Sequence, residues 1–195
     1  HMVREGGLVV LSRFPLRRGE ALHALRTNHK WPRASLLHCR IALPQGDVQF
    51  ASVHLPSPRF GLQAVLDRRT ILKPSRCDLL ESETQHRRRV AQDVSTVLAG
   101  IPGPLVVAGD LNMPVDSTIY RSVWGKEYVN AFSRAGLGYG WTVQGGPRKL
   151  KIGVRVDHVL VRNGLGVLLC ETGPDVGSDH RPLVADIAVN VSRKP

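Results

Sequence analysis

The chain has 195 residues, a length typical of one domain that can bury a core without disulfide bonds or a structural metal. Its net charge of +11 favours a polyanionic partner such as nucleic acid, although a well-solvated basic surface explains the charge equally well. Three separated cysteines with no C-x-x-C pair argue against a disulfide scaffold and a zinc knuckle, and no apolar stretch is long enough to span a membrane.

We interpret residues 3–195 as a single domain and residues 1–2 as a cloning remnant, because His1 precedes a methionine that could start translation. The dispersed cysteines are expected to be reduced thiols, which favours a cytoplasmic location. No secretory leader is visible, and a leader that had been removed would leave no trace in this sequence. We therefore expect a soluble protein without a membrane partner.

The first half of the chain alternates apolar runs with turn residues. Residues 7–11 form a short apolar run that predicts a buried strand. Residues 36–55 predict a β-hairpin, because two apolar runs flank a turn that contains proline, glycine and aspartate. Apolar residues at helical spacing predict a helix over residues 83–99, and Gly100 is expected to end it.

The second half of the chain combines strands with short helices. One short helix is expected over residues 116–124, capped by Asp116 or Ser117, and another over residues 127–136. A glycine-rich basic loop is expected over residues 138–153. Strands are expected at 104–109, 154–161 and 181–189. Strands separated by one long and two short helices predict a layered α/β fold.

Polar side chains gather at the ends of the predicted strands. They are His54, the pair Asp110 and Asn112, Asp157, and the run Ser178-Asp179-His180. Each alone has an ordinary explanation, such as a turn residue or a half-buried strand histidine. Together they supply what metal-assisted phosphoryl chemistry needs. A carboxylate can hold a hard cation, a neutral imidazole can move a proton, and a second carboxylate can orient that imidazole.

The order of these segments resembles the endonuclease/exonuclease/phosphatase superfamily, which includes deoxyribonuclease I-like and exonuclease III-like nucleases, sphingomyelinases and inositol polyphosphate phosphatases. The matching segments span nearly the whole chain: GLVVLSRFPL, ASVHLPSP, RRRVAQDVSTVL, PLVVAGDLNMP, RVDHVLV and GSDHRPLVADI. GDLN and SDHRP at this separation are the specific ones, and residues 130–143 look like bacterial members. The resemblance implies an α/β fold in which two sheets form a sandwich.

The resemblance also implies catalytic roles for five residues. Asp110 would orient or deprotonate the attacking water, and Asn112 would help to hold the phosphate or a metal. His180 would contact the scissile phosphate or act as a base, with Asp157 fixing its tautomer. His54 would stabilise the phosphate or protonate the leaving oxygen. This division of labour suits phosphoryl transfer, which needs an activated water, donors to the phosphate and a protonated leaving group.

A divalent cation, Mg²⁺ or Mn²⁺, is implied by the resemblance, with Asp110, Asn112 and Asp179 as its ligands. The family normally opens with a strand that carries an asparagine and a strand that ends in the glutamate that is the main metal ligand. This chain begins near the segment that should follow them, and no glutamate, Glu5 included, follows a matching strand. We therefore expect an N-terminally abbreviated sandwich, weak metal binding or a preference for Mn²⁺, and a homodimer through an unpaired sheet edge.

DNA is the substrate that the basic charge and the loop over residues 145–151 favour. The resemblance suggests that Arg88 or Arg89 steers phosphate, although an exposed helix face is the simpler explanation. Trp141 could stack on a base, although a buried tryptophan is the commoner case.

The sequence thus predicts a metal-dependent phosphodiester hydrolase, in the first place a DNA endonuclease. One alternative is a catalytically weak or inactive module that binds nucleic acid or another anion. A second alternative is a phosphomonoesterase or a lipid phosphodiesterase of the same family, because pocket shape and loops decide the substrate. A third is half of an enzyme that another chain, or a second copy, completes.

Overall fold

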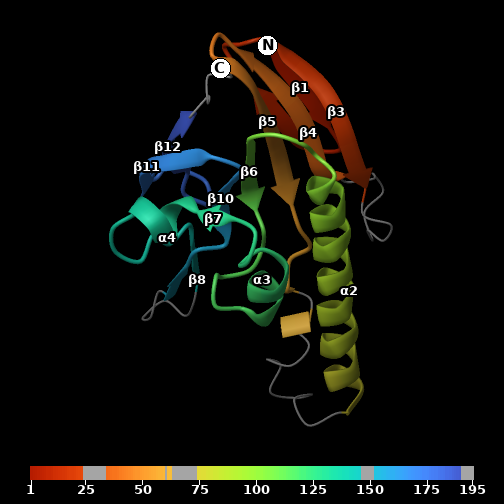
Figure 1. Ribbon diagram of the computed structural model, residues 1–195. Helices are drawn as coiled ribbons and strands as arrows, with labels where there is room; N and C mark the ends of the chain where they lie inside the picture. Colours follow the sequence, from red (N-terminus) through yellow and green to blue (C-terminus); the bar gives the residue numbers. More distant parts are fainter. Residues whose placement is uncertain (24–33, 60, 63–73, 146–151, 190–195) are drawn as a thin grey trace.

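A mixed six-stranded sheet forms the centre of the computed structural model, which describes residues 1–23, 34–59, 61–62, 74–145 and 152–189 (Figure 1). In spatial order its strands are β3 (Leu16–His23), β4 (Ala34–Leu43), β5 (Gly46–His54), β6 (Leu105–Asp110), β10 (Asp157–Arg162) and β7 (Val129–Asn130). Strands β5 and β6 are parallel, and the other neighbours are antiparallel. The α/β class expected from the sequence is confirmed.

The second layer of the sandwich is divided into two hairpins. One is β1 (Met2–Glu5) with β2 (Leu8–Leu11), and the other is β11 (Leu165–Thr172) with β12 (Leu183–Val189). Within the described residues these hairpins do not pair with each other. A third small hairpin, β8 (Val143–Gly145) with β9 (Ile152–Val154), extends from the candidate site described below.

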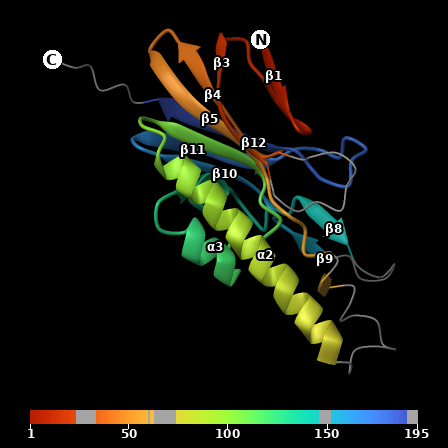
Figure 2. The same cartoon turned by 90° about the vertical axis from the view of Figure 1, so that its right-hand side faces the viewer.

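Helices cover the opposite face of the central sheet. Helices α2 (Pro74–Ala99) and α3 (Thr118–Val123) lie together on one side of β5 and β6 (Figure 2). Helix α4 (Ala131–Ala135) is the exception, because it packs on the other face with β11 and β12. Alternate residues of a strand point to opposite faces, so Leu105 and Val107 of β6 pack against the helices and Val106 packs towards β11 and β12. The central sheet therefore has an apolar core on each face.

Most of the predicted elements are confirmed, with shifted ends. The hairpin predicted over 36–55 is β4 and β5, and the long helix ends at Ala99 as expected. The helix begins at Pro74, earlier than predicted. Its first turns are mostly exposed and carry no apolar face, so helical spacing of apolar residues could not indicate them. Ser117 caps α3 by accepting a hydrogen bond from the Tyr120 amide. The helix expected over 127–136 is shorter, because residues 129–130 pair with β10 instead.

Six of the described strands are absent from the sequence-based prediction: β1, β3, β7, β8, β9 and β11. Strand β3 is an edge strand in which half of the residues are exposed, and Arg17, Arg18 and Glu20 interrupt its apolar residues, so it shows no apolar alternation. Strand β11 also escaped prediction, and so did β1, in which Met2 pairs with Leu11 and the amino group of His1 donates to the Ser12 carbonyl. Residues 1–2 thus belong to the first hairpin. Strand β8 and most of β9 form within the loop predicted over residues 138–153, and residues 146–151 of that loop lie outside the described part of the chain.

In the described residues no helix combines the length and apolar character that a membrane crossing requires.

Candidate active site

The register of the central sheet places three of the predicted site residues side by side. His54 at the end of β5 lies opposite Asp110 at the end of β6, and Asp157 at the start of β10 pairs with Asp110 from the other side. The His54 Nε2 is 3.8 Å from the Asp110 Oδ2. Strand pairing alone therefore aligns an imidazole and two carboxylates along one edge of the sheet.

Gly109 allows β6 to reach this position. Its φ is +140°, a conformation that L side chains rarely adopt, and a Cβ there would overlap the Val53 carbonyl oxygen. The glycine of the GDLN segment is thus required by the close approach of β5 and β6 just before Asp110.

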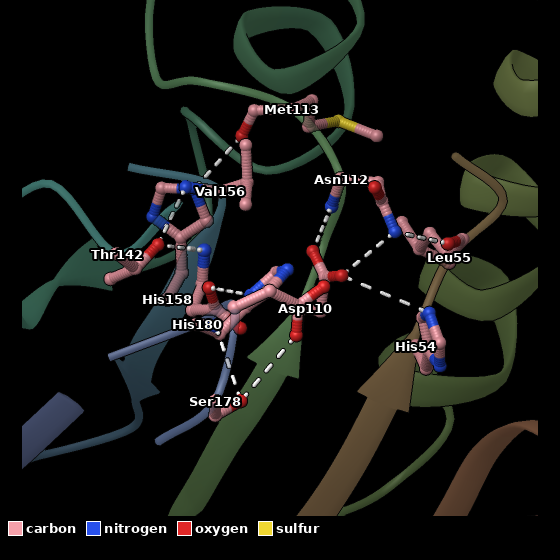
Figure 3. A network of polar contacts seen from close by, with 12 residues as sticks. His54, Leu55, Asp110, Asn112, Met113, Thr142, Val156, His158, Ser178 and His180 are labelled. Carbon is pink, nitrogen blue, oxygen red and sulfur yellow. Dashed lines mark hydrogen bonds and ion pairs between the residues drawn. The ribbon is translucent and has the colours of Figure 1, made fainter. Parts of the chain in front are cut away.

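His180 reaches the same edge from outside the central sheet. It forms an isolated antiparallel bridge with Val143, and its Nδ1 lies 2.8 Å from the Asp157 Oδ2 (Figure 3). A carboxylate only accepts, so Nδ1–H is the donor and Nε2 is the nitrogen that can accept a proton. The His180 amide also donates to the Ser178 Oγ at 3.2 Å. We call His54, Asp110, Asp157 and His180 the strand-end site.

Asn112 holds the carboxylate of Asp110 at both oxygens. Its backbone N–H donates to Oδ1 at 2.7 Å, and its side-chain Nδ2 donates to Oδ2 at 2.9 Å and to the Leu55 carbonyl at 2.8 Å. Asn112 adopts a positive φ of 52°, which asparagine tolerates better than most residues. The structure thus shows Asn112 orienting Asp110. Only its Oδ1 remains for a cation, and its predicted role as a metal ligand stays a prediction.

Two residues that the sequence analysis did not single out hold the loop after β6 in place. Arg87 of α2 donates from Nε to the Pro56 carbonyl at 3.0 Å and from Nη2 to the Asn112 carbonyl at 2.6 Å. His158, which follows Asp157 in β10, is buried, and its Nε2 lies 2.9 Å from the Met113 carbonyl oxygen. The candidate site therefore rests on contacts from α2 and β10.

Thr142 is a third such residue, and it ties the His180 segment to the start of β10. Its fully buried Oγ1 accepts hydrogen bonds from the amides of Val156 at 3.1 Å and Asp157 at 3.2 Å. Its carbonyl accepts one from the Arg181 amide at 2.7 Å. No periodicity or motif distinguishes this threonine in the sequence, because its contacts join segments far apart in the chain.

The two carboxylates of the site repel each other in a partly buried setting. Burial raises the pKa of Asp110 and the charge of Asp157 raises it further, whereas the amide of Asn112 and the two histidines oppose these effects. Burial alone would lower the pKa of His180, but the hydrogen bond to Asp157 and the charges of the nearby aspartates raise it above its usual value. The site therefore favours added positive charge.

A divalent cation fits this donor set. Asp110, Asp157 and His180 each offer one atom, and these atoms all lie within 4.8 Å of one another. Two carboxylates with a raised pKa at one of them suit a hard cation that keeps most of its waters. Asp179 is exposed and lies outside this group, so its role as a ligand stays a prediction. Glu5 is bound to Arg18 and is not in the group either.

The residues predicted to bind substrate lie at the surface or are already in contact with protein. Arg88 and Arg89 are exposed on α2, and their role in steering phosphate stays a prediction. The Arg181 guanidinium lies 3.9 Å from the centre of the Trp141 ring, and Gly153 is so close that a Cβ would contact the same ring. A base that stacks on Trp141 would have to compete with Arg181, so this role also stays a prediction.

The family model described as Endonuclease/Exonuclease/phosphatase family matches residues 3–180. The chain belongs to the endonuclease/exonuclease/phosphatase family. A comparison with curated protein sequences finds no match.

Several solved structures share the fold of this chain. A family protein from Leptotrichia buccalis has a TM-score of 0.64 and 14% identity, with 93% of this chain aligned to 65% of that one. D. rerio TDP2 complexed with a single-strand DNA product has a TM-score of 0.59 and 13% identity, covering 89% of this chain and 69% of that one. A Bacteroides thetaiotaomicron mannosyl-6-phosphatase has a TM-score of 0.57 and 12% identity, covering 93% and 70%. The chain thus spans slightly less than two thirds of the first of these proteins.

Proposed function

We propose that this family member is a metal-dependent phosphodiesterase that cleaves DNA as an endonuclease. The observation that carries the proposal is the clustering of Asp110, Asp157 and His180, whose ligand atoms lie within 4.8 Å of one another, with His54 next to them in the sheet. Members of the family generally hydrolyse phosphate esters, and this edge holds the groups that such chemistry needs.

Each side chain of the strand-end site has a task that its contacts support. Asp110, held at both oxygens by Asn112, is positioned to orient an attacking water and to take its proton. His180 keeps Nε2 free of the Asp157 bond, so it can donate to or accept from the scissile phosphate. His54 is half-exposed at the rim and can protonate the leaving oxygen. A cation held by Asp110 and Asp157 would supply charge that offsets the growing negative charge on phosphate.

DNA is favoured as the substrate on two grounds. The net charge of +11 gives a long-range attraction to a polyanion that neither a small sugar phosphate nor a neutral lipid headgroup would exploit as fully. The second ground is the structural similarity to D. rerio TDP2, whose structure was determined with a single-strand DNA product.

Nicking of supercoiled plasmid tests the proposal. We expect wild-type protein to convert the plasmid to the open circle in Mn²⁺, more slowly in Mg²⁺, and not at all in EDTA. A His180→Ala protein purified in the same way should lose about 100-fold or more of this activity, because it lacks the proton-transfer group. Equal nicking by the two proteins would show that a contaminant cleaves the DNA and would refute the proposal.

Two alternatives predict different results in the same assay. A binding module would retard DNA on a gel in EDTA and would nick nothing in any metal. A phosphomonoesterase would leave the plasmid intact and release inorganic phosphate from small esters, and the similarity to the B. thetaiotaomicron mannosyl-6-phosphatase makes sugar phosphates the first to try.

A further inference from the structure

Arg87 connects three segments that meet at the strand-end site. It projects from α2, and its two hydrogen bonds go to the carbonyls of Pro56 at 3.0 Å and Asn112 at 2.6 Å. Pro56 lies two residues after His54, and Asn112 lies two residues after Asp110. One rigid guanidinium therefore bridges the loops that leave β5 and β6, directly behind the two side chains that those strands deliver.

The contact to Asn112 bears on Asp110 through a short chain of bonds. Arg87 donates to the Asn112 carbonyl. The backbone N–H and the Nδ2 of the same asparagine donate to the two oxygens of Asp110 (Figure 3). Asn112 makes these bonds at a φ of +52°, a conformation that persists only where neighbouring contacts offset its energetic cost. Loss of the Arg87 contact would allow Asn112 to relax and would leave Asp110 with fewer donors.

The guanidinium of Arg87 is partly buried and lies near two carboxylates. Burial lowers the pKa of its guanidinium, and the carboxylates of Asp110 and Glu83 act in the opposite direction. Its side chain is only partly exposed, in contrast to the exposed Arg88 and Arg89 that follow it on α2. Two of its three nitrogens already donate to backbone carbonyls of the loops after β5 and β6, and these contacts favour a positioning role over that of a phosphate ligand.

We infer that Arg87 is a positioning residue, which locks the loops after His54 and Asp110 so that Asn112 holds the Asp110 carboxylate in its reactive orientation. The expected effect on the rate of DNA cleavage rests on the proposed function, whereas the expected effect on the position of Asn112 does not. Misplacement of a catalytic group by about 1 Å can cost about 100-fold in rate. Loss of a positioning residue such as Arg87 is therefore expected to slow the chemical step more than it weakens substrate binding.

Two variants of Arg87 and one control test this inference. Arg87→Gln removes the hydrogen bonds to the carbonyls of Pro56 and Asn112. Arg87→Lys keeps the positive charge and one donor nitrogen in place of two. Arg121→Gln removes an exposed charge from α3 and serves as the control. The first readout needs no activity: the backbone and side-chain amide signals of Asn112 in a ¹H–¹⁵N spectrum of protein in EDTA. The second readout is the kcat and KM for plasmid nicking.

We expect the Asn112 signals to move in Arg87→Gln, less in Arg87→Lys, and not in Arg121→Gln. We expect kcat to fall about 10- to 100-fold in Arg87→Gln with KM changed less than about 2-fold, and Arg87→Lys to lie between this variant and the wild type. If Arg87→Gln fails to fold by circular dichroism, Arg87→Lys alone decides both readouts.

Unchanged Asn112 signals in both Arg87 variants would overturn the inference. So would a raised KM and a weaker salt dependence at constant kcat, because that result would make Arg87 a phosphate ligand. Failure of the proposed function looks different: the wild type itself would cleave no DNA, and the Asn112 signals would still decide whether Arg87 positions the loop.

Discussion

At the scale of single residues, the GDLN segment separates what sequence reasoning can reach from what it cannot. The resemblance assigned Asp110 a role with water, and the structure places that carboxylate between His54 and Asp157. The resemblance does not show that the backbone and side-chain amides of Asn112 would both donate to Asp110, because these bonds depend on a backbone φ of +52° and on contacts from other segments to this loop.

Arg87 shows that a simple periodicity could have improved the prediction. It lies three and four residues before the buried Val90 and Ala91, so it shares their face of α2, whereas Arg88 and Arg89 point away. The helical spacing therefore indicates which arginine of the run faces the protein. What it faces depends on the tertiary arrangement, and the sequence holds no local signal for that.

His158 predicts how stability depends on pH. Only 1% of its surface is exposed, and burial, opposed mainly by the hydrogen bond to the Met113 carbonyl, lowers its pKa from 6.5 to about 4. Between these two pH values the unfolded chain binds a proton at His158 and the folded chain does not. The contribution of His158 to the free energy of unfolding is therefore complete above pH 6.5 and falls as the pH drops towards 4. Between pH 7 and pH 5 this histidine should cost about 2 kcal/mol of unfolding free energy.

Urea unfolding at both pH values measures this effect. His158→Gln should be less stable at pH 7, yet it should lose about 2 kcal/mol less than the wild type between pH 7 and pH 5. His86→Gln on α2 is the control for removing any histidine. An equal loss in the wild type and in His158→Gln would mean that the buried imidazole is not the group that titrates.

At the scale of elements, the apolar strands and the apolar face of the long helix were predictable, whereas the order of strands in the sheet was not. Apolar runs locate β5 and β6, and the apolar face of α2 locates the C-terminal part of that helix. Edge strand β3 and short β7 lack such patterns, because charged, exposed residues interrupt β3 and β7 has only two residues. The register that aligns His54, Asp110 and Asp157 arises from long-range pairing, which periodicity does not encode.

Gly109 offers a prediction about the pairing of β5 with β6. Gly109→Ala adds a Cβ that overlaps the Val53 carbonyl oxygen at a φ of +140°, whereas Gly164→Ala adds one in open space at a φ of +81°. We expect Gly164→Ala to cost about 1 kcal/mol and Gly109→Ala about 3 kcal/mol. Thermal unfolding of both variants measures the difference, and an equal cost would show that the two strands can separate without penalty.

At the scale of the whole molecule, the divided second layer leaves apolar side chains exposed. On the outer face of the β1–β2 hairpin, Met2, Val9 and Leu11 are 62%, 52% and 73% exposed. Within the described part of the chain this short hairpin pairs with no further strand, and its exposed apolar residues favour association with another chain. The homodimer expected from the sequence stays a prediction, and this hairpin is where we expect it to form.

Light scattering over a range of protein concentrations measures the mass of the particle. We expect a dimer that Leu11→Lys converts to a monomer with an unchanged circular dichroism spectrum. Leu137→Lys, at a residue that is 93% exposed in a loop, should leave the dimer intact. A monomer at every concentration in the wild type would rule out this interface.

The central claim is that the strand-end site, and not another part of this basic molecule, cleaves phosphodiester bonds. The most direct test is the plasmid nicking rate of Asp110→Asn in Mn²⁺, measured beside wild type and Asp116→Asn, which alters an exposed acid on the same loop. We predict a fall of about 100- to 10,000-fold in Asp110→Asn, the activity of the wild type in Asp116→Asn, and equal DNA binding by all three in EDTA. A nicking rate in Asp110→Asn that equals that of the wild type would contradict the account.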